Sequence, residues 1–158
     1  MKLSEQLNSA FNEQIMAEYK NSLIYAQIQS WFESLQLKNI AEYFKKQSLH
    51  EAEHAQKFIQ YLNDRRDGKV SIGEINSPGL DFLSVESVGD IYVSTEEGTT
   101  ESIESIYELA CDTKSFIDLP FLLSMLSEQV EEENSSAEFA LKLKTTKDLV
   151  LFNATLEV

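Results

Sequence analysis

The sequence predicts an all-α protein: a four-helix bundle with a long crossover between the second and third helices and a short fifth C-terminal helix. Long segments carry apolar residues at helical spacing and contain few helix breakers. One segment with several Gly residues and a Pro interrupts them, and a short apolar cluster follows the last long helix. The 158 residues suffice for one sizeable core, so we expect a single domain, residues 1–158.

The first two helices are predicted from their apolar stripes. Between Ser4 and Leu37 there is neither Gly nor Pro, and apolar residues recur at helical spacing. A second run extends from Ile40 to about Leu62, where N-D-R-R-D-G ends it. Residues 64–83 lack a helical stripe. We therefore expect a connection that travels the length of a bundle and lets two helices run parallel.

The third helix is expected over residues 85–112, although Gly89, Gly98 and several Thr residues make its middle a poor helix former. A short connection around residues 118–120 leads to a fourth helix over residues 121–143. The fifth helix, residues 149–157, has an apolar cluster too small to be stable alone. It should dock on the bundle.

Charge and cysteine content limit the classes of partner. Lys and Arg total 13 against 27 Asp and Glu, and the net charge of -14 repels nucleic acid and anionic membranes while attracting cations. The apolar runs are shorter than the roughly 20 residues of a membrane span. Cys111 has no partner for an intrachain disulfide, and the opening residues lack the apolar core of a secretion signal. We expect a cytoplasmic protein with no nucleic-acid partner and no membrane partner.

Ionisable residues lie on the apolar stripes of the first two helices. Glu18 lies seven residues before Tyr25, and Glu51 and His54 lie seven and four residues before Phe58. Burying these groups costs several kcal/mol unless something such as a metal ion satisfies them. Carboxylates and an imidazole suit a di-iron site. The alternative is a chance match, because Glu-x-x-His spacing occurs in many helices.

The fourth helix carries an acidic run, S-E-Q-V-E-E-E, over residues 127–133. Gln129 and Glu132 share one helix face, whereas Glu128 and Glu131 share a neighbouring face. By composition alone, the run is a solvated acidic surface.

Taken together, these segments resemble a bacterial non-haem ferritin. The resemblance rests on N-E-Q-I-M-A-E-Y, S-L-I-Y-A-Q, Trp31, H-E-A-E-H-A-Q-K-F-I-Q-Y-L-N-D, I-N-S-P and S-E-Q-V-E-E-E, in order along nearly the whole chain. It implies a ferritin-like four-helix bundle that stores iron in a homo-oligomeric cage of twenty-four subunits. It also implies a ferroxidase, which oxidises Fe(II) with oxygen or hydrogen peroxide at an intrasubunit di-iron centre without haem.

Residue by residue, the resemblance implies that Glu18, Glu51 and His54 hold the first iron ion. Glu51 bridges to a second ion, which is held partly by Glu132, and Gln129 lies beside the centre.

Five further positions are interpreted through the resemblance. Tyr25 matches a tyrosine that serves electron transfer in the family, and its alternative role is a core aromatic with a bonded hydroxyl. Trp31 also matches a position of the family pattern, and we expect it to serve as a packing residue. Glu128 and Glu131 match ligands of an accessory third iron site. His50 occupies a position where that site usually takes a Glu, so we expect an exposed or hydrogen-bonded histidine there.

The third helix departs from the family pattern. Counting forward from Ser77-Pro78 places the family's Glu ligand at Glu96, whereas counting back from Glu108-Leu109-Ala110 places it at Thr99. Both positions lie on the inward stripe, and we choose Glu96.

Two alternative functions remain. A storage-only cage subunit would have a degraded second iron position. Another ferritin-like di-iron oxidase or peroxidase, such as a rubrerythrin or a bacterioferritin, should carry a second Glu-x-x-His, but the matching segment reads Glu-Gln-Val-Glu at residues 128–131. A rubrerythrin would also need Cys pairs for its rubredoxin iron.

Overall fold

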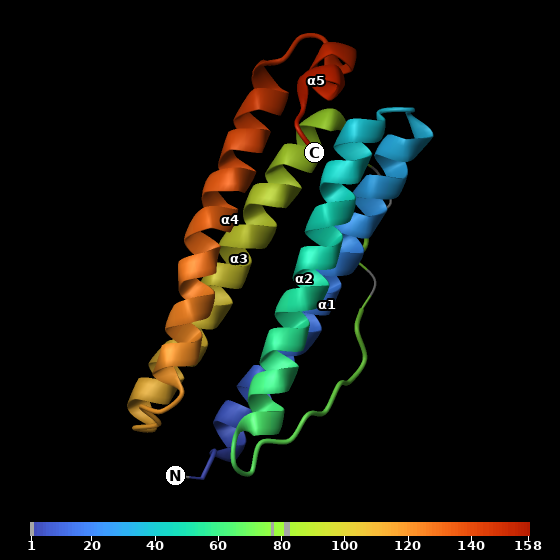
Figure 1. Cartoon of the computed structure of the whole chain (residues 1–158). Coiled ribbons are helices and arrows are strands. Elements are labelled where there is room, and N and C mark those ends of the chain that lie inside the picture. Colours follow the sequence, from blue (N-terminus) through green and yellow to red (C-terminus); the bar gives the residue numbers. More distant parts are fainter. Residues whose placement is uncertain (1, 77, 81–82) are drawn as a thin grey trace.

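The computed structural model describes residues 2–76, 78–80 and 83–158. The described residues form helices and connections without a strand, which confirms the all-α fold (Figure 1). The five helices are α1 (Glu5–Ser34), α2 (Lys38–Asp64), α3 (Val85–Asp112), α4 (Leu119–Thr145) and α5 (Leu149–Thr155). None of these helices is long and apolar enough to span a membrane.

The four long helices form two antiparallel pairs, α1 with α2 and α3 with α4 (Figure 1). The connection after α2 returns along the outside of α1 to the far end of the bundle, so α2 and α3 run parallel. The predicted crossover is therefore confirmed, although Ser77 and residues 81–82 lie outside the described part of the chain.

Polar side chains of α1 attach the crossover to the bundle. Asn12 Nδ2 donates to the Lys69 carbonyl at 2.8 Å, and Asn12 Oδ1 accepts the Ser71 backbone N–H at 2.6 Å. Near the other end, Gln27 donates to the Leu80 carbonyl at 2.6 Å. These contacts satisfy backbone groups of a segment that has no regular structure of its own.

Local signals explain the helix ends. Ser4 accepts the Leu7 backbone N–H, and Ser84 and Ser87 form a reciprocal capping box at the start of α3. Helix α4 begins at Leu119, two residues before the predicted start, because Pro120 fits the first turn, where its missing N–H has no intrahelical partner.

The predicted weak middle of α3 does not interrupt the helix. Gly89 faces α4, where an added Cβ would lie 3.2 Å from the Cβ of Ala140. The glycine thus allows α3 and α4 to approach closely, which offsets part of its low helix propensity.

Helix α5 docks on the end of the bundle through apolar packing and hydrogen bonds. Phe152 is buried and its ring packs against Phe139. Asn153 Oδ1 accepts the backbone N–H groups of Asn39 and Ile40 at 2.9 and 3.1 Å. It therefore satisfies donors at the start of α2, whose N-cap residue Leu37 makes no side-chain cap.

The apolar core divides into two clusters along the bundle axis. On α1, Leu7, Phe11 and Ile15 belong to one cluster, whereas Tyr25, Ile28 and Phe32 belong to the other. Between them lies a group of buried polar residues that we call the polar layer: Gln14, Glu18, Asn21, Glu51, His54, Glu96, Thr99, Gln129 and Glu132. Because this layer crosses the middle of the bundle, the two apolar clusters must hold the helices together on either side of it.

A buried ion pair joins the end of α2 to the α3–α4 turn. Asp118 Oδ1 accepts from Arg65 Nε at 2.7 Å and from the Tyr61 hydroxyl at 2.5 Å, and Asp118 Oδ2 accepts from Ser115 at 2.5 Å. Burial alone raises the pKa of Asp118, but the hydrogen bonds from Arg65, Ser115 and Tyr61 outweigh it and hold the pKa below its usual value. Asp118 is thus kept ionised and fully hydrogen-bonded.

Replacing Asp118 should destabilise this end of the bundle. Asp118→Ala leaves Arg65 buried without its carboxylate, and we expect the free energy of unfolding to fall by roughly 3 kcal/mol. The matched control is Asp112→Ala, which removes an exposed carboxylate from the end of α3. Thermal unfolding by circular dichroism measures both, and equal Tm values for the two variants would contradict the expectation.

Candidate metal centre

Each of the four long helices contributes ligand-type side chains to the polar layer. Glu18 comes from α1, Glu51 and His54 from α2, Glu96 from α3, and Gln129 and Glu132 from α4. The first four are fully buried. The structure therefore places the inner residues predicted from the sequence in one layer at the centre of the bundle.

Glu18, Glu51 and His54 form the tightest group, which we call the inner cluster. One ligand atom from each lies within 4.8 Å of the others. His54 Nδ1 lies 3.7 Å from Glu51 Oε1 and 4.0 Å from Glu18 Oε2. These three atoms are buried and have no hydrogen-bond partner among the described residues. Buried polar atoms are rarely left unpaired, so the inner cluster fits a cation bound between two carboxylates and an imidazole.

The protonation of the inner cluster reflects its burial. Desolvation raises the pKa of Glu51 well above its usual value, and the negative charges of Glu18 and Glu96 raise it further. Burial likewise raises the pKa of Glu18. The pKa of His54 is lowered by burial and by the positive charges of His50 and Lys57. Without a cation the cluster therefore favours protonated carboxylic acids and a neutral imidazole.

Polar residues of α1 orient the two carboxylates. Gln14 donates to Glu18 Oε1 at 2.8 Å and Asn21 donates to Glu51 Oε2 at 3.1 Å, which leaves the other oxygen of each carboxylate facing His54. Ser102 of α3 donates to Gln14 Oε1 at 2.5 Å. These residues were not predicted from the sequence, although Gln14 and Asn21 share the inward stripe of Glu18 and their spacing indicates it.

On α3, Glu96 is the carboxylate that reaches the polar layer. Glu96 Oε1 accepts a short hydrogen bond from the Tyr25 hydroxyl, and Oε2 accepts from Gln129 at 3.4 Å. Burial raises the pKa of Glu96 to about 7, although the hydrogen bond from Tyr25 lowers it. Thr99 is also buried, but its hydroxyl accepts from Asn21 at 2.9 Å. Both positions face inward, as expected, and the carboxylate comes from Glu96.

Tyr25 has the features of a core aromatic with a bonded hydroxyl, whereas its implied role in electron transfer stays a prediction. Its ring packs edge-on against Tyr92 with centroids 5.4 Å apart, so it belongs to the core. Its hydroxyl donates to Glu96, a carboxylate of the polar layer. Burial and the charge of Glu96 raise the pKa of Tyr25 well above its usual value, so the phenol stays protonated. Trp31 packs against Phe32, as expected for a packing residue.

The acidic run of α4 divides between the interior and the surface. Glu132 faces α2, with its Oε1 2.9 Å from His50 Nδ1. Glu128 is half-exposed and lies 3.2 Å from His54 Nε2 and 2.5 Å from Lys57 Nζ. Glu131 is exposed and belongs to no group of potential metal ligands among the described residues. The accessory third site implied for Glu128 and Glu131 thus remains a prediction.

Comparisons with known proteins relate the chain to ferritins. A family model described as a ferritin-like domain matches residues 8–146. The bacterial non-heme ferritin of Staphylococcus aureus is 30% identical over 132 residues, which cover 84% of this chain and 79% of that protein. The chloroplastic ferritin-4 of Arabidopsis thaliana is 31% identical over 151 residues, but the chain spans only 58% of its length.

Solved structures agree with this relationship. An open-pore ferritin from the archaeon Archaeoglobus fulgidus superposes with a TM-score of 0.92 at 28% identity, covering 98% of this chain and 96% of the other. A variant of the protein PmFTN that was soaked in iron gives a TM-score of 0.90 at 25% identity, covering 98% of this chain and 100% of that one.

The raised pKa of Glu96 makes stability depend on pH. In the metal-free protein, the Glu96 carboxyl ionises near pH 4.5 when the chain is unfolded and near pH 7 when it is folded. The folded state therefore loses stability as the pH rises through this interval. Glu96→Gln keeps an acceptor for Tyr25 and removes the titration. We expect its Tm to exceed that of wild type by about 7–14 °C at pH 8 and by much less near pH 5.

The control for this measurement is Glu97→Gln, which removes the neighbouring, exposed carboxylate of α3. Its difference from wild type should not change between pH 5 and pH 8. If Glu96→Gln and Glu97→Gln gave the same pH dependence, Glu96 would not carry a raised pKa in the folded protein.

Proposed function

The chain belongs to the ferritin family, and we propose that it stores iron and oxidises Fe(II) at a di-iron ferroxidase centre within each subunit. One observation carries the proposal. Three buried ligand atoms of Glu18, Glu51 and His54 converge without hydrogen-bond partners among the described residues. Two further carboxylates, Glu96 and Glu132, are buried in the same layer.

In this proposal the first iron ion binds to Glu18, Glu51 and His54, and Glu51 also bridges to a second ion. Glu96 and Glu132 complete the second position, with Gln129 beside it. Carboxylates are hard ligands, and they favour the more highly charged Fe(III) over Fe(II). A site rich in carboxylates therefore lowers the free energy of the oxidised ions relative to the reduced ones.

The paired arrangement matches the electron count of the reaction. Two Fe(II) ions lose one electron each, and these two electrons with two protons reduce dioxygen to hydrogen peroxide or hydrogen peroxide to two molecules of water. Because burial raises the pKa of Glu51 and Glu96, iron must displace protons from them as it binds. Iron affinity should therefore increase as the pH rises towards 7.

We also propose that the subunits assemble into a homo-oligomeric cage of twenty-four copies that encloses ferric mineral. Exposed apolar side chains support assembly: Phe116 and Ile117 lie at the α3–α4 turn, and Val150 and Leu151 lie on α5. The cytoplasmic location and the absence of haem stay predictions.

Glu96 favours this function over a storage-only cage subunit. That alternative requires the second iron position to lack its α3 carboxylate, but Glu96 is buried in the polar layer beside Gln129. A rubrerythrin-like peroxidase or a bacterioferritin is less well supported. Both histidines of the chain, His50 and His54, lie on α2, so α4 offers no imidazole.

Removing the bridging carboxylate should abolish rapid oxidation. We expect Glu51→Ala to slow the initial oxidation of two Fe(II) per subunit by about 10- to 100-fold or more, because both iron positions lose a ligand. Glu53→Ala removes an exposed carboxylate from the same helix and should oxidise iron at the wild-type rate. Stopped-flow absorbance of the ferric product measures the rates, with assembly checked by size exclusion. Wild-type kinetics in Glu51→Ala would refute the proposed centre.

The hydroxyl of Tyr25 can be tested separately from its ring. Tyr25→Phe preserves the packing against Tyr92 and removes the hydrogen bond to Glu96. We expect slower iron oxidation without a change in assembly. Tyr92→Phe is the matched control, since it removes a buried hydroxyl that pairs with Tyr43 instead. If both variants oxidised iron equally fast, Tyr25 would serve only as a core residue.

A further inference from the structure

Thr99 of α3 is a buried polar residue that the proposed iron positions do not use. Its hydroxyl donates to the Thr95 carbonyl at 3.0 Å and accepts from Asn21 Nδ2 at 2.9 Å. The first bond lies within α3, whereas the second crosses to α1. Thr99, one of the two candidate ligand positions on α3, is thus bonded to a neighbouring helix.

Asn21 connects Thr99 to the inner cluster. Its amide nitrogen carries two hydrogens and serves two acceptors, Thr99 Oγ1 at 2.9 Å and Glu51 Oε2 at 3.1 Å. A chain of hydrogen bonds, which we call the relay, therefore runs from α3 through α1 to the carboxylate of α2. Glu51 Oε1 has no hydrogen-bond partner among the described residues and lies 3.7 Å from His54 Nδ1. The relay thus engages one oxygen of Glu51 and leaves the other free to face a cation.

The hydroxyl of Thr99 sets the orientation of the Asn21 amide. A hydroxyl has one proton, and Thr99 donates its proton to the Thr95 carbonyl, so its oxygen acts as an acceptor towards Asn21. Asn21 therefore turns its NH₂ group to this side, and the same group faces Glu51 Oε2. With the amide reversed, its oxygen would lie against an ionised carboxylate without a proton between them, and such a contact is costly in the interior.

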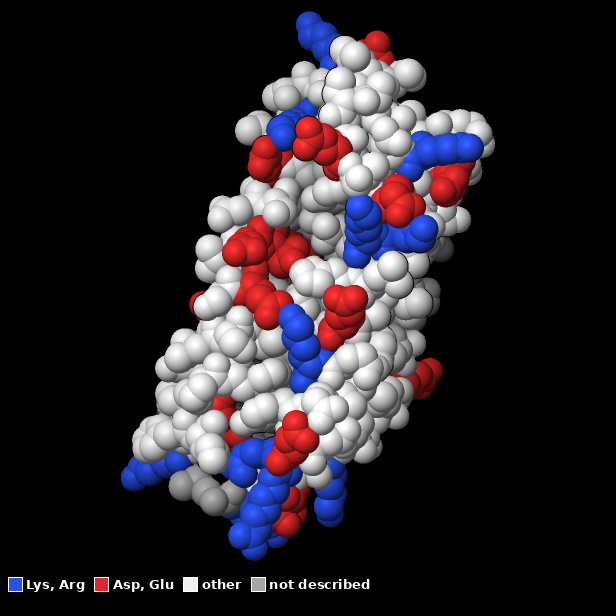
Figure 2. Space-filling view, viewed as in Figure 1, with Lys and Arg blue, Asp and Glu red and all other residues white. Residues whose placement is uncertain are grey.

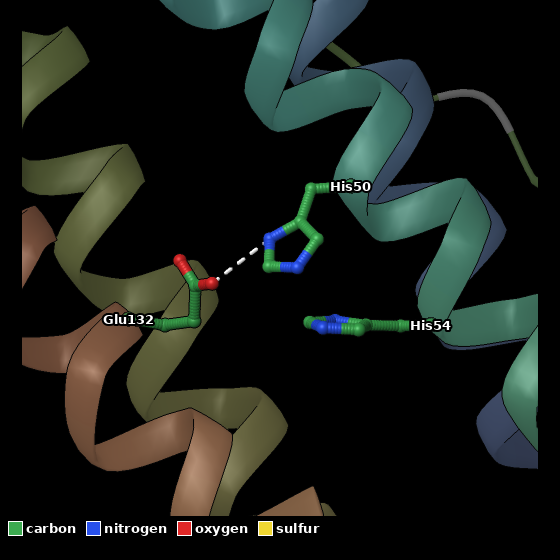
Figure 3. A group of neighbouring side chains, drawn as sticks. All are labelled: His50, His54 and Glu132. Atoms are coloured by element: carbon green, nitrogen blue, oxygen red, sulfur yellow. Dashed lines mark ion pairs between the residues drawn. The ribbon is translucent and has the colours of Figure 1, made fainter.

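The relay lies on the closed side of the polar layer. On the open side, where α2 faces α4, His50 extends towards Glu132 and its side chain is 36% exposed (Figure 3). Acidic side chains gather on that face, at mid-height over α4 and its border with α2 (Figure 2). Between α1 and α3, by contrast, both Asn21 and Thr99 are buried. The hydrogen bond to Glu51 Oε2 therefore comes from the protein rather than from water.

The carboxylate of Glu18 is held by a similar combination of groups. Ser102 of α3 donates to Gln14 Oε1 at 2.5 Å, and Gln14 Nε2 donates to Glu18 Oε1 at 2.8 Å. In both arrangements an amide of α1 turns its NH₂ group to a carboxylate, and a hydroxyl of α3 binds that amide. Helix α3 thus contributes to the orientation of two carboxylates that belong to α1 and α2.

We propose that Thr99 is a positioning residue for Glu51: through Asn21 it holds Glu51 Oε2, so that Oε1 faces the cation position beside Glu18 and His54. This role rests on the di-iron centre of the proposed function and adds to it a residue that acts through another side chain. A carboxylate that is already oriented loses less conformational freedom when an ion binds. Breaking the relay should therefore weaken metal binding without unfolding the bundle.

The test measures Co²⁺ binding to the assembled, iron-free protein. Co²⁺ follows Fe²⁺ in the affinity series of divalent metals, and its visible absorption reports the geometry of its ligands. Absorption that is lost in Glu51→Ala identifies the ion at the proposed centre, and titration of this absorption gives the affinity. Circular dichroism establishes that each variant is folded.

Two substitutions of Thr99 separate its hydroxyl from its shape. Thr99→Val removes the hydroxyl and should weaken Co²⁺ binding by about tenfold or more and shift the absorption of the bound ion. Thr99→Ser keeps the hydroxyl and should bind Co²⁺ as wild type does. The matched control is Thr100→Val, because the Thr100 hydroxyl bonds within its own helix, to the Glu96 carbonyl at 3.2 Å. This control should change neither the affinity nor the absorption.

A double-mutant cycle tests whether Thr99 acts through Asn21. Asn21→Ala should weaken Co²⁺ binding by about tenfold or more, and adding Thr99→Val should weaken it no further, because the relay is already broken. Additive effects, wild-type affinity in folded Thr99→Val or Asn21→Ala, or weak binding in Thr99→Ser would each overturn the positioning role while the metal centre stands. If wild type showed no Co²⁺ binding that depends on Glu51, the metal centre itself would be refuted, and the relay with it.

Discussion

The burial of several carboxylates in the middle of a helical bundle is the constraint on which the rest of the structure depends. Glu18, Glu51 and Glu96 are fully buried, and no lysine or arginine lies among the buried residues of the polar layer. Placing like charges together in a low-dielectric interior is unfavourable unless protons or cations bind to them. The inner cluster is therefore suited to hold positive charge, and the raised pKa values of its carboxylates and the metal affinity that we propose for it have the same physical origin.

This constraint determines how the fold is stabilised. The polar layer cannot supply apolar contacts, so two separate hydrophobic clusters pack the bundle on either side of it. Specific polar contacts hold the ends: Asp118 with Arg65 at one end, and Asn153 at the start of α2 at the other. The central layer costs stability in the metal-free protein, as is common where a site is organised for function.

The boundary between α2 and α4 is where the polar layer meets solvent. His54 lies there with one ring nitrogen facing the inner cluster and the other facing Glu128. His50 and Lys57 flank it on the same helix, each paired with a carboxylate of α4. The side chains at this boundary thus also connect the two helices.

The sequence by itself determined the helices, their order and the inward face of each. Helical spacing places Glu18, Glu51 and His54 on apolar stripes, and the breakers at residues 64–83 identify the crossover. Predicted ends differ from the observed ones where local residues decide the boundary, as Pro120 does in the first turn of α4. Only the tertiary structure decided that Tyr25 donates to Glu96, that Thr99 pairs with Asn21, and that His50 faces Glu132. The reason is that spacing along one helix fixes only the direction of a side chain, whereas its partners depend on how the neighbouring helices are aligned along the bundle axis.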